Sequence, residues 1–281
     1  MNGNTQLVGI LGYPVSQSKS PVMHNVAFAE LGLNWAYVPL PVHPDLVERA
    51  LKGLLALGFR GVNVTTPYKE TVLPFMNELS PSAHAINAVN TISITPDGKL
   101  IGDNTDARGF VQDLQENNVD VKNSTALILG AGGSSRAILY GLLQAGCPEV
   151  ILLNRTLDKA AKTAQEIGVY FPKVNIQTAL FDESNISRFS KAKLIINCTS
   201  LGRQENSDQM PWYDNISFQR DQVVYDLIYH PNPTRFLEKA KHDGARTLNG
   251  LGMLVHQGAL SFTIWTGVQP SIETMRIAIA E

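Results

Sequence analysis

The sequence predicts an α/β fold in two domains. Its 281 residues exceed one average domain, and 44% hydrophobic with 17% charged residues is the composition of a globular chain. Strand-length apolar runs alternate with helix-length amphipathic runs from residue 7 onward, a pattern typical of parallel βα units. A second series of such units begins at Thr125, directly before a glycine-rich turn. We therefore expect one α/β domain in each half of the chain.

The first half alternates three times between strand and helix before a predicted hairpin. Each strand is a short apolar run, and each helix is a longer amphipathic one. The expected elements are strands 7–11, 36–42 and 61–64 and helices 21–31, 45–57 and 70–79. Runs 88–94 and 99–102 flank Pro96-Asp97-Gly98, a combination suited to a tight turn, and so predict the hairpin.

The second half begins with an apolar strand at 125–129, a glycine-rich turn and a helix at 134–144. Strand 150–153 follows at the spacing of a Rossmann fold, the doubly wound sheet that binds dinucleotides. The later expected elements are strands 175–180, 194–198, 223–227 and 246–248, helices 158–167 and 233–242, a surface loop at 202–222 with a short helical turn, and closing helices 252–265 and 272–280.

Charge and cysteine content exclude several classes of partner. The formal net charge is −2 with scattered Lys and Arg, so we expect neither a nucleic-acid nor an anionic-membrane partner. The first residues lack a basic region, and the apolar stretch after them is only strand-sized, which predicts neither a signal peptide nor a membrane span. Cys147 and Cys198 lie far apart in apolar runs and are expected to be free thiols. A cytoplasmic protein is implied.

A candidate nucleotide site begins with Gly130, Ala131, Gly132, Gly133 and Ser134. Gly130 would allow the tight turn after the strand, and Gly132 would let a pyrophosphate approach the free NH groups at the helix N-terminus. Ser135 stands at the third fingerprint position in place of Gly or Ala, and is still small enough for helix–strand packing. The alternative is a glycine-rich turn that binds nothing.

The end of the second strand of this domain favours NADP over NAD. An NAD enzyme would hold an acid there for the ribose 2′-hydroxyl, whereas this chain has Asn154, Arg155 and Thr156. Arginine can bind a 2′-phosphate in a bidentate way, and Lys159 adds a second cation at helix spacing. The alternative for Arg155 is a solvated surface charge, and Asp158 keeps some use of NAD open.

Two serines precede Pro21, a residue suited to the first turn of a helix. The hydroxyls of Ser18 and Ser20 and the free NH groups of the helix would face one space, which suits a carboxylate. A plain helix cap explains the local sequence equally well.

A lysine and an aspartate each follow a strand in the first half. Pro67 ends the strand 61–64 and delivers Lys69 onto a loop, while Asp106 follows the strand-like stretch 99–102. An ammonium and a carboxylate that converge at strand ends provide a proton donor with a tuned pKa. The alternative for Lys69 is a surface lysine at the start of a helix. The alternative for Asp106 is an N-cap of the following helix, and Asp106 could be both an N-cap and a catalytic group. The six histidines show no close metal-ligand spacing, so no metal is expected.

Together these motifs resemble those of shikimate dehydrogenases. The resemblance runs almost end to end, from Gly9-Ile10-Leu11-Gly12 to Gly250-Leu251-Gly252-Met253. It implies that the serines bind the shikimate carboxylate and that further side chains bind the carboxylate or the ring hydroxyls, namely Thr65, Lys69, Asn90, Asp106, Tyr229 and Gln257. It also places Leu227 and Gly250 at the nicotinamide end, and associates Asn154-Arg155-Thr156 with NADP.

The resemblance implies an N-terminal substrate domain, 1–106 completed by helices 252–281, and a Rossmann-type NADP-binding domain, 107–251. The implied reaction is the reversible NADP-dependent reduction of 3-dehydroshikimate to shikimate, in the shikimate pathway of aromatic amino acid biosynthesis, by a monomer or homodimer. Lys69 and Asp106 are the expected catalytic residues. Two alternatives stay open: a quinate/shikimate dehydrogenase that uses NAD or NADP, and a catalytically silent NADP-binding sensor.

Overall fold

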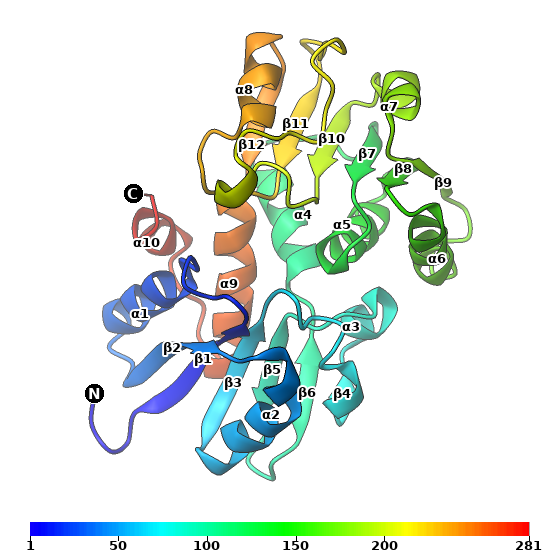
Figure 1. Ribbon diagram of the computed structural model, residues 1–281. Coiled ribbons are helices and arrows are strands. Elements are labelled where there is room, and N and C mark those ends of the chain that lie inside the picture. Colours follow the sequence, from blue (N-terminus) through cyan, green and yellow to red (C-terminus); the bar gives the residue numbers. More distant parts are fainter. Residues whose placement is uncertain (281) are drawn as a thin grey trace. The chain divides into compact units, whose positions relative to one another are not determined.

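The structure is a computed structural model that describes residues 1–280. It divides into two compact units, one formed by residues 1–109 and the chain from Leu254 onward, the other by residues 110–253. Within the described residues, each unit is built on one six-stranded sheet with helices packed against it (Figure 1). The predicted α/β class is confirmed.

The sheet of the first unit is mixed, with the strand order β2-β1-β3-β5-β6-β4. Strands β1, β2 and β3 are parallel, β5 is antiparallel to β3, and β6 is antiparallel to β5. The carboxyl ends of β1, β3 and β6 and the amino end of β5 therefore share one edge of the sheet. The strands are β1 Gln6–Gly12, β2 Trp35–Pro41, β3 Phe59–Val64, β4 Glu78–Leu79, β5 Thr91–Ile94 and β6 Leu100–Asp103.

The helices of this unit follow the amphipathic pattern, as α2 illustrates. Its residues Val47, Leu51 and Leu54 recur at helical spacing and pack on Val62 and Val64 of β3 in one buried cluster. The helices are α1 Ser20–Glu30, α2 Val47–Ala56, α3 Pro81–Ile86 and α10 Ile272–Ile277, with most of α9 Leu251–Thr266 and the start of α4 Asp106–Glu116.

The helix expected at 70–79 is wrong. Leu73–Phe75 is a single 3₁₀ turn, and β4 follows it. Pro74 explains the difference, because proline inside a helix has no NH to donate and its ring clashes with the carbonyl four residues earlier. Helix α3 was not predicted, although Ser80 before Pro81 is an N-cap signal. The Ser80 hydroxyl accepts a hydrogen bond from the Ala83 NH at 3.1 Å.

The sheet of the second unit is fully parallel, with the order β12-β11-β10-β7-β8-β9. Counted from its own first strand this is the Rossmann order, in which the connections reverse direction between β7 and β10. The elements are β7 Thr125–Leu129, α5 Gly133–Gln144, β8 Glu149–Asn154, α6 Leu157–Gly168, β9 Asn175–Leu180, α7 Glu183–Phe189, β10 Leu194–Asn197, β11 Val223–Asp226, α8 Arg235–His242 and β12 Arg246–Asn249.

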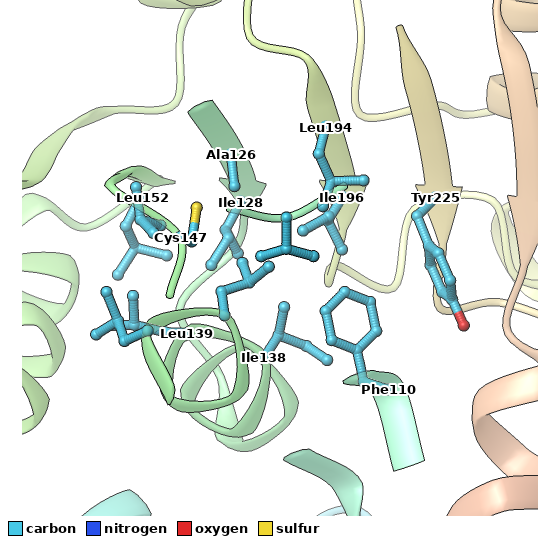
Figure 2. Close-up of a cluster of buried hydrophobic side chains, with 14 of the residues drawn as sticks. Phe110, Ala126, Ile128, Ile138, Leu139, Cys147, Leu152, Leu194, Ile196 and Tyr225 are labelled. Carbon is cyan, nitrogen blue, oxygen red and sulfur yellow. The ribbon is translucent and has the colours of Figure 1, made fainter. Parts of the chain in front are cut away.

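The central strands of this sheet are buried on both faces, which explains their unbroken apolar runs. Ile128 of β7 belongs to a cluster on one face, and its neighbours Leu127 and Leu129 belong to a cluster on the other. Figure 2 shows the first cluster, in which α5 places Ile138 and Leu139 against the sheet. The Gly-rich turn between β7 and α5 is thus anchored on both sides by buried elements.

Candidate active site

Six of the predicted substrate-site residues lie at one edge of the first unit's sheet. Ser18 and Ser20 follow β1, and Thr65 and Lys69 follow β3. Asn90 directly precedes β5, and Asp106 follows β6 as the first residue of α4. The strand directions bring these four loops to the same edge, which is where ligands bind in open α/β sheets.

Lys69 and Asp106 form a close ion pair at this edge. The distance from Lys69 Nζ to Asp106 Oδ2 is 2.5 Å, and the side chains are only 15% and 6% exposed. The Lys69 carbonyl accepts a hydrogen bond from the Val89 NH at 2.7 Å, which fixes the loop that carries the lysine. A charged pair so little exposed requires further hydrogen bonds to its free oxygen, and Asp106 has one.

That bond comes from Asn90. Its side-chain NH2 donates to Asp106 Oδ1 at 2.8 Å and to the Thr105 hydroxyl at 2.8 Å. The Asn90 carbonyl oxygen accepts from the Thr105 NH at 2.8 Å. Gln257 of α9 approaches the same NH2 group through its own carbonyl oxygen at 3.4 Å. Hydrogen bonds thus connect four of the predicted residues, Lys69, Asn90, Asp106 and Gln257.

Ser18 lies just before α1, and Ser20 is the first residue of the helix. The Ser18 hydroxyl accepts a bond from the Ser20 NH at 3.3 Å, but the N-cap position is taken by Lys19 with no side-chain cap bond, so the plain helix cap that the sequence allowed is not formed. Ser20 is 3% exposed and is hydrogen-bonded to the Tyr37 phenol. Thr65 is fixed by the bond from its NH to the Leu11 carbonyl at 2.9 Å, which ties the loop after β3 to β1.

Tyr229 lies in the other unit, in the segment after β11, and is half-buried. Leu227, in the same segment, is also half-buried and donates its NH to the Asn197 carbonyl at 3.1 Å. Gly250 follows β12, and a Cβ there would lie 2.1 Å from the Leu227 carbonyl oxygen. No side chain fits at that distance, so the close approach of these two segments requires glycine.

The glycine turn of the second unit has the geometry that the sequence predicts. Gly130 has a φ of +105°, which other residues rarely adopt. Gly132 is the N-cap of α5, and a Cβ built on it would meet nothing within 4 Å. Ser135 is fully buried, and its hydroxyl accepts from the Gly132 NH at 3.2 Å. The open space at Gly132 and the free NH groups of the helix start suit a phosphate.

The end of β8 is tied to this turn by a side chain. Asn154 accepts a bond from the Ala131 NH at 3.2 Å and donates to the Thr156 carbonyl at 2.9 Å. Arg155, Thr156 and Lys159 are all exposed. An asparagine that holds the turn leaves the next two side chains and Lys159 available to a ligand.

Sequence reasoning did not find a set of buried polar residues below the ion pair. Each is less than a tenth exposed. Three lie in strands or helices that otherwise look apolar, and one lies in a loop: Asn63 in β3, Thr91 in β5, Ser261 in α9, and Thr105 before α4. The one local signal is Asn63, because a buried polar side chain inside an apolar strand requires a hydrogen-bond partner.

A buried carboxyl group was also not predicted. Asp226, at the end of β11, accepts bonds from the Thr234 hydroxyl at 2.7 Å, the Asn197 amide at 2.9 Å and the Ile228 NH at 3.0 Å. Burial raises the pKa of Asp226 to about 6, against the lowering effect of these bonds.

The second unit has the doubly wound sheet of dinucleotide-binding domains, and the first unit has a lysine–carboxylate pair at its sheet edge. These two features define a class of protein, the dinucleotide-dependent dehydrogenases. Three family models match the chain: the shikimate dehydrogenase substrate binding domain at residues 10–92, shikimate/quinate 5-dehydrogenase at 113–209, and the shikimate 5'-dehydrogenase C-terminal domain at 250–279. The chain belongs to the shikimate dehydrogenase family, which confirms the resemblance seen in its motifs.

Relatives match over nearly the whole length. The shikimate dehydrogenase (NADP(+)) of Carboxydothermus hydrogenoformans is 47% identical and covers 99% of this chain and 98% of its own. A crystal structure of a shikimate dehydrogenase in complex with NADP+ has a TM-score of 0.91 at 40% identity, covering 100% of this chain and 96% of that one. The shikimate 5-dehydrogenase of Thermus thermophilus, in complex with NADP(H) and shikimate, has a TM-score of 0.87 at 36% identity, covering 97% and 98%.

Proposed function

We propose that this chain is an NADP-dependent dehydrogenase that interconverts 3-dehydroshikimate and shikimate, in the biosynthesis of aromatic amino acids. The observation that carries the proposal is the Lys69–Asp106 pair, 2.5 Å apart and little exposed at the sheet edge. A protein that only sensed NADP would gain nothing from a buried ion pair, whose desolvation is costly. Full-length relatives that carry the name shikimate dehydrogenase (NADP(+)) support the same reaction.

The proposed division of labour follows the two units. Residues 1–106 with 252–281 would bind substrate, and residues 107–251 would bind NADP. The substrate groups are Ser18 and Ser20 for the carboxylate, and Thr65, Lys69, Asn90, Asp106, Tyr229 and Gln257 for the hydroxyls or the carboxylate. The cofactor groups are Gly130, Ala131, Gly132, Gly133, Ser134, Asn154, Arg155, Thr156, Lys159, Leu227 and Gly250.

Lys69 is the proposed proton donor and acceptor. NADP supplies or takes the hydride when bound. As the substrate carbon changes between ketone and alcohol, the Lys69 ammonium gives a proton to its oxygen or the free amine takes one back. Asp106 holds the Lys69 ammonium in position through the 2.5 Å bond.

The direct test is NADPH formation by the purified chain. Shikimate and quinate are each offered with NADP and with NAD, and the absorbance of the reduced cofactor is followed. We expect the highest kcat/KM with shikimate and NADP. A preference for quinate would support the quinate/shikimate alternative, and binding of NADP without turnover of either acid would support the silent sensor.

The remaining proposed properties combine the composition with the family resemblance. The protein would act in the cytoplasm on a small molecule, as a monomer or homodimer, without a nucleic-acid or membrane partner. The formal net charge of −2 supports the absence of a nucleic-acid footprint. Among residues 1–280, no helix has both the length and the apolar character needed to cross a membrane.

Replacing Arg155 with Ala should raise the KM for NADP roughly 10- to 100-fold, which is the loss expected for one charged hydrogen bond. The KM for NAD should barely change, because NAD has no 2′-phosphate for the exposed guanidinium to bind. Steady-state kinetics with both cofactors measure this difference. Arg188, an arginine of the same unit on α7, provides a matched Arg→Ala control. An equal loss with NADP and NAD would show that Arg155 has a structural role.

Replacing Ser18 with Ala should weaken shikimate binding by about 1 to 3 kcal/mol, because the substrate carboxylate loses a donor. Affinity for NADP, measured by direct titration, should stay unchanged. Methyl shikimate lacks the charge and should lose less affinity than shikimate does. If the ester and the acid lost affinity equally, Ser18 would not be binding the carboxylate.

A further inference from the structure

A chain of buried side chains continues from the ion pair into the first unit. We define the buried network as Tyr37, Asn63, Thr91, Thr105 and Ser261. All five are 6% exposed or less. They come from β2, β3, β5, the loop before α4, and α9, and so join segments far apart in the sequence.

Asn63 lies at the centre of the buried network. Its carbonyl oxygen accepts from the Tyr37 hydroxyl at 2.8 Å. Its NH2 group is therefore directed the other way, toward the Ser261 hydroxyl at 2.9 Å, the Thr91 hydroxyl at 3.1 Å and the backbone carbonyl of Asn90 at 3.2 Å. The Tyr37 ring is held by stacking on His24, with ring centroids 4.3 Å apart, so the phenol stays directed at Asn63.

The direction of the bonds continues to the ion pair. An NH2 group only donates, so the Thr91 hydroxyl accepts from Asn63 and can donate its own proton to the Asn90 carbonyl oxygen at 2.9 Å. The side-chain oxygen of Asn90, which also accepts from the Thr105 NH at 2.8 Å, is thereby fixed as an acceptor. Its NH2 group must then face Asp106 Oδ1, at 2.8 Å, and Asp106 Oδ2 accepts from Lys69.

Ser261 closes the network from α9. Its hydroxyl lies 2.8 Å from that of Thr91 and 3.2 Å from that of Thr105, and it donates to the Gln257 carbonyl at 3.0 Å. The turn of α9 that carries Gln257 is thus bonded to the same group of hydroxyls that orients Asn90. A fully paired network in a low-dielectric interior has one favoured arrangement.

We propose that Asn63, Thr91 and Ser261 are positioning residues that fix the amide orientation of Asn90 and, through it, hold Asp106 as the acceptor for Lys69. The inference rests on the proposed function, because it assigns these residues to the geometry of that reaction. Without the Thr91 hydroxyl, the side-chain oxygen of Asn90 loses one of the donors that orient it and keeps the bond from the Thr105 NH at 2.8 Å. The Asn90 amide is then held less firmly, and with it the bond to Asp106 that keeps the carboxylate beside Lys69.

The test compares two identical substitutions. Thr91→Val removes a hydroxyl from the buried network with little change of shape. Thr263→Val makes the same change on α9, where the hydroxyl bonds the Ala259 carbonyl at 2.9 Å and lies outside the network. We expect Thr91→Val to lower kcat for shikimate oxidation roughly 3- to 20-fold, the effect of about one hydrogen bond, and Thr263→Val to leave it unchanged. The KM for NADP should be the same in both.

A double-mutant cycle separates positioning from a general loss of stability. If Thr91 acts through Asp106, Thr91→Val should have almost no further effect on kcat in an Asp106→Asn background. Ser261→Ala, which removes the hydroxyl that α9 contributes to the network, should likewise have almost no further effect on kcat in the Asp106→Asn background. This second variant keeps the test decisive if Thr91→Val fails to fold. Melting temperatures of all variants give the stability loss, which should not track kcat.

The outcomes are distinguishable. Additive effects of Thr91→Val and Asp106→Asn, or equal loss of kcat in Thr91→Val and Thr263→Val, would overturn the inference while the active wild type keeps the proposed function. A wild-type chain that forms no NADPH from shikimate would overturn the proposed function, and the positioning role with it.

Discussion

Lys69→Ala should lower kcat for shikimate oxidation roughly 100- to 10,000-fold, the usual contribution of general acid–base catalysis. Shikimate affinity should fall much less, because under the proposed function uniform binding would come mainly from neutral groups such as Asn90 and Gln257. The reason is the geometry of the pair: Asp106 Oδ2 holds Lys69 Nζ at 2.5 Å, at the sheet edge where the proposed proton exchange would take place. Asp106→Asn should also lower kcat, since an amide loses the charge that holds the ammonium.

Steady-state kinetics of both variants and a direct shikimate titration measure these effects. The matched control is Lys52→Ala, which removes a lysine paired with Glu48 at 2.6 Å in the same unit, where the side chains are 73% and 57% exposed. That exposed pair should be worth little and its loss should leave kcat unchanged. A Lys69→Ala enzyme that turned over near the wild-type rate would remove the lysine from the mechanism.

His24 should make the protein acid-labile. Its ring is 0% exposed, stacks on Tyr37 and Phe262, and has no hydrogen-bond partner within residues 1–280 at either nitrogen. Burial lowers the pKa of His24 from 6.5 to about 3. The unfolded chain therefore binds a proton at a pH where the folded chain does not. The free energy of unfolding should fall by about 1.4 kcal/mol per pH unit as the pH drops below 6.5, down to about pH 3.

The comparison that isolates this effect is with His24→Phe, which keeps a stacked ring and cannot be protonated. Asp226 acts in the opposite sense, because its raised pKa of about 6 makes its contribution fade as the pH rises through that value. Asp226 is common to both proteins and cancels. Between about pH 6.5 and pH 4.5, urea unfolding should show the wild type losing about 2 kcal/mol relative to His24→Phe.

The control for this comparison is His43→Gln at an exposed histidine, whose side chain is 56% exposed. It should lose stability in parallel with the wild type over the same pH range. A stability difference between wild type and His24→Phe that did not change with pH would show that His24 can be protonated in the folded chain.

Elements with one dominant local signal could be predicted from the sequence. The strand 125–129 is apolar on both faces, and β7 has the same bounds, Thr125–Leu129. The helix expected at 134–144 corresponds to α5, Gly133–Gln144, because a glycine turn fixes its start. Helix 70–79 failed where Pro74 outweighed the amphipathic pattern. The mixed strand order of the first sheet was not predicted. The sequence indicates that β5 and β6 form a hairpin, but it does not indicate which other strand that hairpin pairs with.

The candidate site divides in the same way. Lys69 and Asp106 each follow a strand, so the sequence could predict that they meet, and the structure places them in contact. Asn63, Thr91 and Ser261 could not be predicted as a group. Their bonds span 28 to 198 residues of chain, and hydroxyls and amides in apolar elements have no spacing of their own. Only the three-dimensional register of β3 with β5, and of both with α9, brings them together.

The first unit is assembled from two stretches of chain, and this sets the order in which the protein can be completed during translation. The ribosome delivers residues 1–109 first and then the whole of residues 110–253, before Gln257 and Ser261 exist outside it. Until then Asn63 and Thr91 lack the hydroxyl of Ser261, and Gly61 lies without the indole of Trp265, which in the finished protein donates to the Ile92 carbonyl at 3.0 Å. Although domains of a nascent chain usually fold in order from the N-terminus, here the nucleotide unit is contiguous and can finish first. While the 144 residues 110–253 are being synthesised, the buried polar groups of the nascent N-terminal sheet lack some of their hydrogen-bond partners. The sheet must avoid non-native contacts with these groups during that time.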